Sequence, residues 1–86
     1  GQIPLNLSAL GADYYVTNGH KWLCSPKGSA VLVVAPHCQV PSLHPAIISN
    51  NFGKGYAAEF YWTGTRDFSA WLSMVDAIAF REQQHG

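Results

Sequence analysis

The protein has 86 residues, enough for one small domain and too few for two. Its net charge is zero and no apolar run approaches the length of a membrane span, so we expect neither nucleic acid nor a membrane as a partner. Charged residues make up only 12% of the chain and hydrophobic residues 48%. So few charges predict that other polypeptide covers part of the surface.

The first third of the chain predicts a short helix and then two strands. Residues 5–11 form a single helical turn, with Asn6 as N-cap and Gly11 just beyond its end. Residues from about 13 to 18 are aromatic and β-branched, which is typical of a strand. Residues from about 29 to 35 are almost wholly apolar, which predicts a strand buried on both faces of a layered α/β sheet. We predict that the two strands pair in antiparallel fashion.

The remainder predicts a long loop and one long helix. Prolines and glycines recur through residues 36–58, so this range is expected to be a connecting loop. Asp67 can cap a helix that runs to about residue 84, with apolar residues spaced along one face. A second apolar stripe lies beside the first, and a face this wide requires more than one packing neighbour.

The connection between the two strands, residues 17–28, carries an amine, an imidazole, a thiol and a hydroxyl. Loops held by rigid elements are where catalytic groups concentrate, and a lysine amine can attack a carbonyl. Lys21 is therefore the candidate catalytic residue. The alternative is an ordinary solvated lysine in a polar hairpin connection. His20 is either a plain loop residue or a second group facing the same ligand, and its spacing leaves both interpretations open.

The cysteines and histidines predict no metal site. Cys24 and Cys38 form no C-x-x-C pair, and two free thiols are the expected state. The histidines lack recognised ligand spacings, and prolines around His37 and His44 indicate irregular loop there. No signal peptide is recognisable at the N-terminus, so we expect a cytoplasmic protein.

The sequence Thr63-Gly64-Thr65 lies just before the predicted long helix. Helix N-termini present unpaired N–H groups and the positive end of the helix dipole, so this turn is a candidate anion cradle. The alternative is simple helix capping, which serines and threonines provide in many proteins.

Two segments together resemble one known family. Residues 10–30, with the motif H-K-W-L-x-x-P-K-G, closely resemble the cofactor-lysine segment of class V aminotransferases, which are pyridoxal-phosphate enzymes of fold-type I. Residues 61–72, with the motif G-T-R-D, resemble a later segment of the isopenicillin N epimerase-like branch of that family. The order and spacing of the two segments also match the family.

The resemblance implies roles for five residues. Lys21 is implied to be the Schiff-base lysine of pyridoxal phosphate and to move the proton at the substrate α-carbon. His20 and Asn18 are implied to lie at the cofactor, Asn18 standing where relatives often have a phosphate-binding Ser. Gly64 and Thr65 match a turn that reaches the phosphate of the other subunit's site in the family's homodimers. Cys24 matches no catalytic residue of the family and is assigned a structural role, and the resemblance leaves Arg66 without a role.

The resemblance also implies that parts of the enzyme lie outside these 86 residues. The family's aspartate at the pyridine nitrogen, the ring-stacking aromatic residue and the carboxylate-binding arginine have no counterpart here. We therefore interpret residues 1–86 as part of the large, cofactor-binding domain of an enzyme that acts on an amino acid by transamination, epimerisation or desulfuration. By itself the chain is expected to be inactive. The alternative hypothesis is a catalytically inactive truncated remnant or interaction module.

Overall fold

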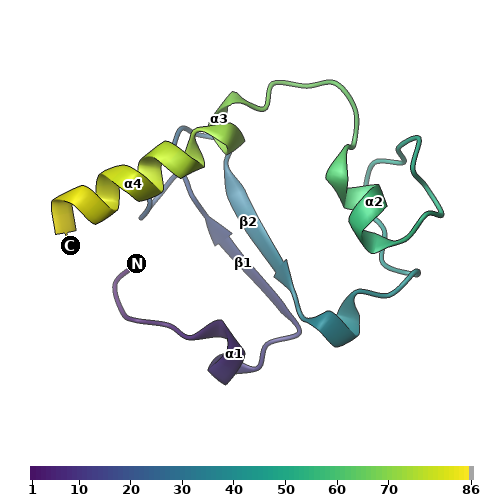
Figure 1. Ribbon diagram of the computed structural model, residues 1–86, viewed down its shortest axis with the longest axis horizontal. Helices are drawn as coiled ribbons and strands as arrows, with labels where there is room; N and C mark the ends of the chain where they lie inside the picture. The colour runs from purple at the N-terminus through teal and green to yellow at the C-terminus, as the bar shows by residue number, and fades with distance from the viewer. Residues whose placement is uncertain (86) are drawn as a thin grey trace. The chain divides into compact units, whose positions relative to one another are not determined.

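Figure 1 shows the computed structural model of the protein, which describes residues 1–85. The chain forms two compact units: the first comprises Gly1–Val33 and the segment from Asp67 onward, and the second is Val34–Arg66. The elements in chain order are α1 (Leu7–Leu10), β1 (Tyr14–Asn18), β2 (Ala30–Val34), the 3-10 helix η1 (Pro36–Cys38), α2 (Tyr56–Tyr61), α3 (Ser69–Leu72) and α4 (Met74–His85).

The strands β1 and β2 form a two-stranded antiparallel sheet, and their arrows run in opposite directions in Figure 1. This confirms the predicted antiparallel pair in a small α/β structure. Each strand has five residues, slightly shorter than its predicted range. The connection from residue 19 to residue 29 contains Lys21.

The short first helix forms as its sequence predicts. The Asn6 side chain accepts a hydrogen bond from the Ala9 N–H at 3.2 Å, which satisfies one of the free donors of the first turn. Gly11 ends α1 at φ 71°, a left-handed conformation that costs glycine little, and its N–H donates to the Leu7 carbonyl. The turn thereby sets the direction in which the chain enters β1.

The prediction of one long helix over residues 67–84 is wrong, because the structure has two helices that meet at Ser73. Ser73 ends α3 with φ −72° and ψ −8°, and its hydroxyl donates to the Ser69 carbonyl at 2.7 Å. The Ser69 carbonyl therefore accepts from both the hydroxyl and the N–H of Ser73, an arrangement that often bends helices. The N-cap of α3 is Phe68 and not the predicted Asp67, although the Asp67 carboxylate accepts from the Ser69 N–H at 2.9 Å.

The predicted loop over residues 36–58 contains more regular structure than expected. Pro36 begins η1, where the fixed φ of proline suits a first helical position and its missing N–H costs nothing. Further on, α2 already begins at Tyr56, and its sequence includes the helix-favouring residues Ala57, Ala58 and Glu59. Neither element was predicted from the sequence, because prolines and glycines are frequent in this range.

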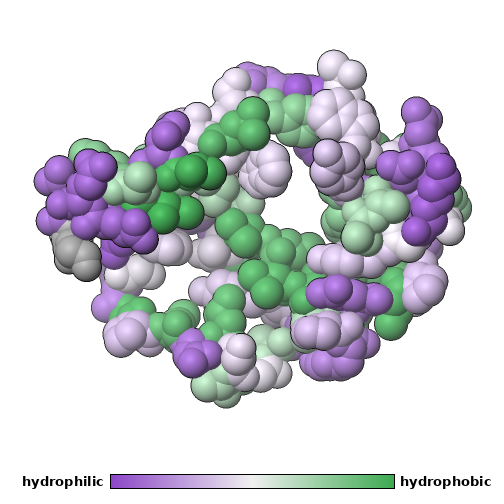
Figure 2. Space-filling view, viewed as in Figure 1, coloured by the Kyte–Doolittle hydropathy of each residue, from purple (hydrophilic) through white to green (hydrophobic). Residues whose placement is uncertain are grey.

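Few apolar side chains are buried. Leu23, Val34 and Met74 are the buried hydrophobic residues of the described chain. The expectation that the second strand is buried on both faces is wrong for this chain, since Leu32 is 46% exposed and the sheet has only two strands. The helical apolar face is open as well: Trp71, Leu72, Val75 and Phe80 are each at least 59% exposed. Figure 2 shows hydrophobic residues at the surface of α4.

No helix within residues 1–85 combines the length and the apolar character that crossing a membrane requires.

Candidate functional site

Lys21 lies in the turn that follows β1, and its side chain is exposed. Asn18 is the last residue of β1 and His20 immediately precedes the lysine; both are half-buried. Sequence analysis selected these three residues as a group, and the structure brings them together at one end of the strand pair.

The connection that carries Lys21 is closed by the Ser29 carbonyl. This oxygen accepts from the Gly19 N–H at 2.9 Å and from the His20 N–H at 3.4 Å. It also lies 3.0 Å from His20 Nδ1. Because a carbonyl can only accept, Nδ1 carries the hydrogen, and the Nε2 of a neutral His20 is left with a lone pair. The contact therefore fixes both the orientation of the imidazole and its tautomer.

A chain of hydroxyl groups crosses the same connection. The Ser29 hydroxyl donates to the Pro26 carbonyl at 2.8 Å and also contacts the Ser25 hydroxyl. Since Ser29 has one hydroxyl hydrogen and gives it to Pro26, Ser25 is the donor in the contact between the two serines. Ser29 is only 1% exposed and Ser25 only 6% exposed. The hydrogen bond between the two serines is therefore shielded from water, which strengthens it and helps to hold the connection in one conformation.

Close packing adds to the hydrogen bonds. Gly19 is buried, and a Cβ atom at this position would lie 2.8 Å from Met74 Cε and 2.9 Å from Ser25 Oγ. The absence of a side chain at Gly19 is therefore what allows α4 and the Ser25 turn to approach the end of β1. Sequence analysis missed Ser25, Ser29 and Met74, because only their packing around Gly19 gives them a role.

Cys24 is exposed, with its backbone at φ 62°, which is uncommon for a residue other than glycine. Its N–H donates to the Lys21 carbonyl at 3.1 Å, so the turn that holds Lys21 closes on Cys24. Cys24 and Cys38 are both free thiols, as the sequence predicts.

The second pair of predicted cofactor-binding residues, Gly64 and Thr65, lies in the second unit. Gly64 has φ 128°, a conformation that side chains rarely allow, and a Cβ there would meet no atom within 4 Å. Thr65 is exposed. Arg66 Nη2 donates to the Thr63 hydroxyl at 3.3 Å across this turn.

One buried ionisable residue was not selected from the sequence. Glu59 of α2 is 1% exposed, and its Oε1 lies 2.7 Å from His44 Nδ1. Its Oε2 has no hydrogen-bond partner among the described residues. His44 also stacks on Phe52, with ring centroids 4.9 Å apart. The contact between His44 and Glu59 connects α2, which leads into the Thr63–Arg66 turn, to the loop before it. Because fifteen residues separate the two partners, their spacing in the sequence did not indicate the contact.

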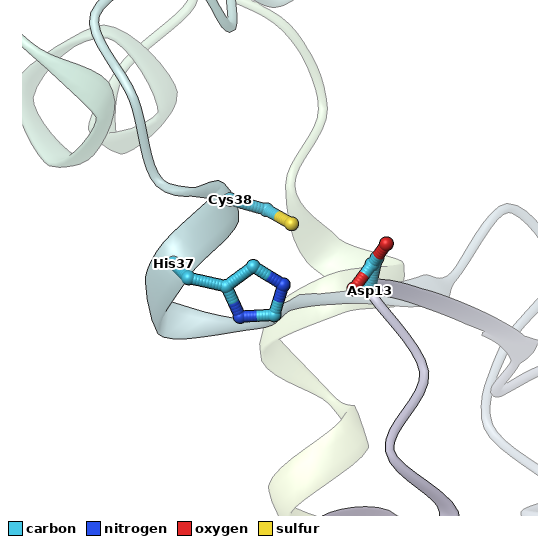
Figure 3. A group of neighbouring side chains, drawn as sticks. All are labelled: Asp13, His37 and Cys38. Carbon is cyan, nitrogen blue, oxygen red and sulfur yellow. The ribbon is translucent and has the colours of Figure 1, made fainter.

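Figure 3 shows His37 and Cys38 on consecutive residues of η1, together with Asp13, which precedes β1. Asp13 belongs to the first unit, whereas His37 and Cys38 belong to the second. Two adjacent side chains of one short helix do not make a metal site, so we assign none to them.

The first unit also contains a cavity of about 620 Å³ between the N-terminal segment, the strand pair and α4. Its lining is largely apolar and includes Trp22, Leu23 and Met74. Lys21 is not part of this lining, so the cavity is not the candidate active site.

The chain is similar to L-cysteine desulfhydrases and to isopenicillin N epimerases. A putative L-cysteine desulfhydrase of Oryza sativa subsp. japonica is 37% identical over 87 residues, covering 100% of the chain and 18% of the relative. An L-cysteine desulfhydrase of Arabidopsis thaliana is 33% identical, covering 100% of the chain and 19% of the relative. An isopenicillin N epimerase of Amycolatopsis lactamdurans is 34% identical, covering 94% of the chain and 24% of the relative.

The chain matches an internal part of pyridoxal-phosphate enzymes of the class V aminotransferase family. The resemblance stated from residues 10–30 and 61–72 is thereby confirmed, including its epimerase-like branch. The chain spans only about 17 to 25% of the length of these L-cysteine desulfhydrases and isopenicillin N epimerases. These relatives are desulfhydrases and epimerases, so they give no support to a transaminase activity in particular. No protein-family model and no solved structure matches the chain.

Proposed function

We propose that the chain is the segment of a fold-type I pyridoxal-phosphate enzyme that carries the cofactor lysine, and that this lysine is Lys21. The full-length protein, here called the parent enzyme, is proposed to act on an amino acid, by desulfuration, epimerisation or transamination. The observation that carries the proposal is the exposed Lys21 amine on a connection held by buried hydrogen bonds.

The side chains present fit this cofactor. Pyridoxal phosphate requires an amine for its aldehyde and hydrogen-bond donors for its phosphate. Lys21 offers the amine, and its position in a turn leaves that amine accessible. The Thr65 hydroxyl and the open backbone at Gly64 offer donors that suit a phosphate. Asn18 offers a side-chain amide that can also donate.

In the parent enzyme, some of these residues are proposed to bind the cofactor and Lys21 is proposed to transfer a proton. When bound, the cofactor withdraws electrons from the substrate α-carbon. Lys21 Nζ is proposed to take up and return the α-proton. His20 presents an imidazole whose Nδ1–H is already committed to the Ser29 carbonyl, so only the ring face and Nε2 remain for a ligand. His20 is therefore proposed to orient the cofactor and not to transfer a proton through Nδ1.

Gly64 and Thr65 are proposed to serve the active site of a second subunit, so that the parent enzyme works as a homodimer. Support comes from their place in the second unit, on a turn with an exposed threonine and an unobstructed glycine. An exposed turn of this kind is able to reach outward to a ligand that its own subunit does not hold.

The test compares two lysines on the same connection. Lys21 and Lys27 are both exposed, and Lys27 lies beyond Pro26. In the parent enzyme, Lys21→Ala is expected to abolish both the absorbance of bound cofactor and its covalent trapping by borohydride, because no other amine takes the same position. Lys27→Ala is the matched control and is expected to retain both signals. Trapped cofactor at an undiminished level in the Lys21→Ala variant would refute the assignment.

A further inference from the structure

Arg81 of α4 contacts the residue directly after Lys21, although 59 residues separate Arg81 from Trp22. Arg81 Nη1 donates to the Trp22 carbonyl at 3.3 Å. The guanidinium carbon also lies 5.4 Å from the centroid of the Trp22 ring, within the range of a cation–π contact. One side chain thus contacts both the backbone and the ring of the lysine's neighbour.

Trp22 is held from other directions as well. Its indole Nε1 donates to Thr17 Oγ1 of β1 at 2.9 Å. The N-terminal backbone packs against the ring, since a Cβ on Gly1 would lie 2.7 Å from Trp22 Cε3. Arg81 Nη2 donates to the Gly1 carbonyl at 3.4 Å, so the guanidinium joins both segments. Trp22 is therefore fixed by β1, by the N-terminal segment and by α4.

The planar shape of the guanidinium is what makes these contacts compatible. Arginine presents several N–H donors in a rigid fork while its flat face stacks on an aromatic ring. A lysine at the same position can keep a charge near the ring, but it cannot also present a planar fork to two carbonyls. The arrangement therefore depends on arginine in particular and not only on positive charge.

We infer that Arg81 is a positioning residue for Lys21, acting through Trp22. The inference rests on the proposed function of Lys21. The Trp22 carbonyl belongs to the peptide unit directly after the one that joins Lys21 to Trp22, so fixing that carbonyl restricts the backbone that carries the reactive amine. Arg81 itself makes no contact with the reacting atoms in this account; it sets the direction from which the amine meets the cofactor aldehyde.

The experiment measures how fast Lys21 captures the cofactor. The parent enzyme is prepared without cofactor and mixed with pyridoxal phosphate, and borohydride is added at successive times. Mass spectrometry then quantifies the modified Lys21 and Lys27 peptides in each sample. Lys27 is the internal control, because it lies on the same connection but beyond Pro26.

Arg81→Gln is expected to slow capture at Lys21 roughly tenfold, well inside the ~100-fold that a displacement of about 1 Å can cost. Capture at Lys27 is expected to stay unchanged. Arg81→Lys should recover part of the rate, because it keeps the charge but not the fork. Glu82→Gln, an exposed neighbour on α4, is the matched control and should behave as the unaltered enzyme.

Equal capture rates at Lys21 in the unaltered enzyme and both Arg81 variants would overturn the inference. So would a parallel slowing at Lys21 and Lys27, which would mean that Arg81 only stabilises the fold. If Arg81→Gln does not fold, Arg81→Lys and Trp22→Phe carry the test, and unchanged capture in both would overturn it equally. Failure of the proposed function shows up separately, as trapped cofactor in the Lys21→Ala variant.

Discussion

The two segments proposed to bind the cofactor are held in very different ways. The connection around Lys21 contains the buried Ser25 and Ser29, and its backbone closes on the Ser29 carbonyl. In the Thr63–Arg66 turn, Thr65 and Arg66 are exposed, and the Arg66 guanidinium donates to the Thr63 hydroxyl. The first segment is therefore preorganised by the hydrogen bonds within its own unit. The second segment is open, which suits a role toward a ligand held by another subunit.

The largest change to the Lys21 connection is expected from Gly19→Ala. The new Cβ would lie 2.9 Å from Ser25 Oγ and 2.8 Å from Met74 Cε. Overpacking of this kind costs roughly 1 to 3 kcal/mol, which denaturant unfolding of the parent enzyme would measure. In a Ser25→Ala background the same substitution should cost less, because one of the two clashes is removed. Equal costs in both backgrounds would show that Ser25 is not what excludes a side chain at Gly19.

The open turn is tested by Thr65→Ala in the parent enzyme. Loss of one hydrogen bond to a charged phosphate is expected to weaken cofactor binding by roughly 1 to 3 kcal/mol. Because Thr65 is exposed, the unfolding free energy should change little. Equilibrium titration with pyridoxal phosphate measures the first quantity and thermal unfolding the second. Unchanged cofactor affinity would remove Thr65 from the site.

Ser29→Ala probes the hydroxyl chain that crosses the Lys21 connection. The substitution removes the partner of the buried Ser25 hydroxyl and also the donor to the carbonyl of the exposed Pro26. The expected loss of stability is about 1 to 2 kcal/mol. Ser8→Ala, at an exposed serine of α1, is the control and should be close to neutral. A neutral Ser29→Ala variant would mean that the backbone bonds alone hold the connection.

The smallest effect concerns the start of α3, just after the open turn. Hydrogen bonds from the Ser69 hydroxyl and then from the Ser69 N–H lower the pKa of Asp67 below its ordinary value of 3.8. The stabilisation is therefore present above pH 3.8 and is lost as the pH falls through the lowered pKa. Ser69→Ala should move the pKa back toward 3.8, measured by NMR titration of the carboxyl.

Ser73→Ala is the control for that measurement, because the Ser73 hydroxyl donates to a backbone carbonyl and not to Asp67. A pKa of Asp67 that moves equally in both variants would show that the Ser69 hydroxyl is not its cause.

Sequence reasoning predicted the parts of this structure that depend on local chemistry. The β-branched and aromatic residues before Asn18, the N-cap Asn6 and the turn at Gly11 each form what their residue types favour. The break at Ser73 was missed because it depends on whether one hydroxyl turns toward the Ser69 carbonyl. The apolar pattern of β2 correctly indicated a strand but not its burial, because burial depends on neighbours that a two-stranded sheet does not supply.

In the candidate site, too, some residues could be predicted from the sequence and others could not. Lys21, His20 and Asn18 are adjacent in sequence, so one motif identified them together. Ser29 and Arg81 act across 9 and 59 residues, respectively. Contacts of that separation are set by how the chain folds back on itself, and residue types give no sign of them. The contact between His44 and the buried Glu59 was not predicted for the same reason.

The triple use of the Ser29 carbonyl also determines how the Lys21 connection opens. The Gly19 and His20 amides donate to this single oxygen, and the Ser25 amide donates to the Gly19 carbonyl next to it. Each of these amides must break its hydrogen bond before it exchanges its hydrogen with solvent, and two of the three bonds share one acceptor. We therefore expect the connection to open as one cooperative unit and not residue by residue. A loop that opens only as a unit would keep the Lys21 amine in place during the small fluctuations that break hydrogen bonds in ordinary surface turns.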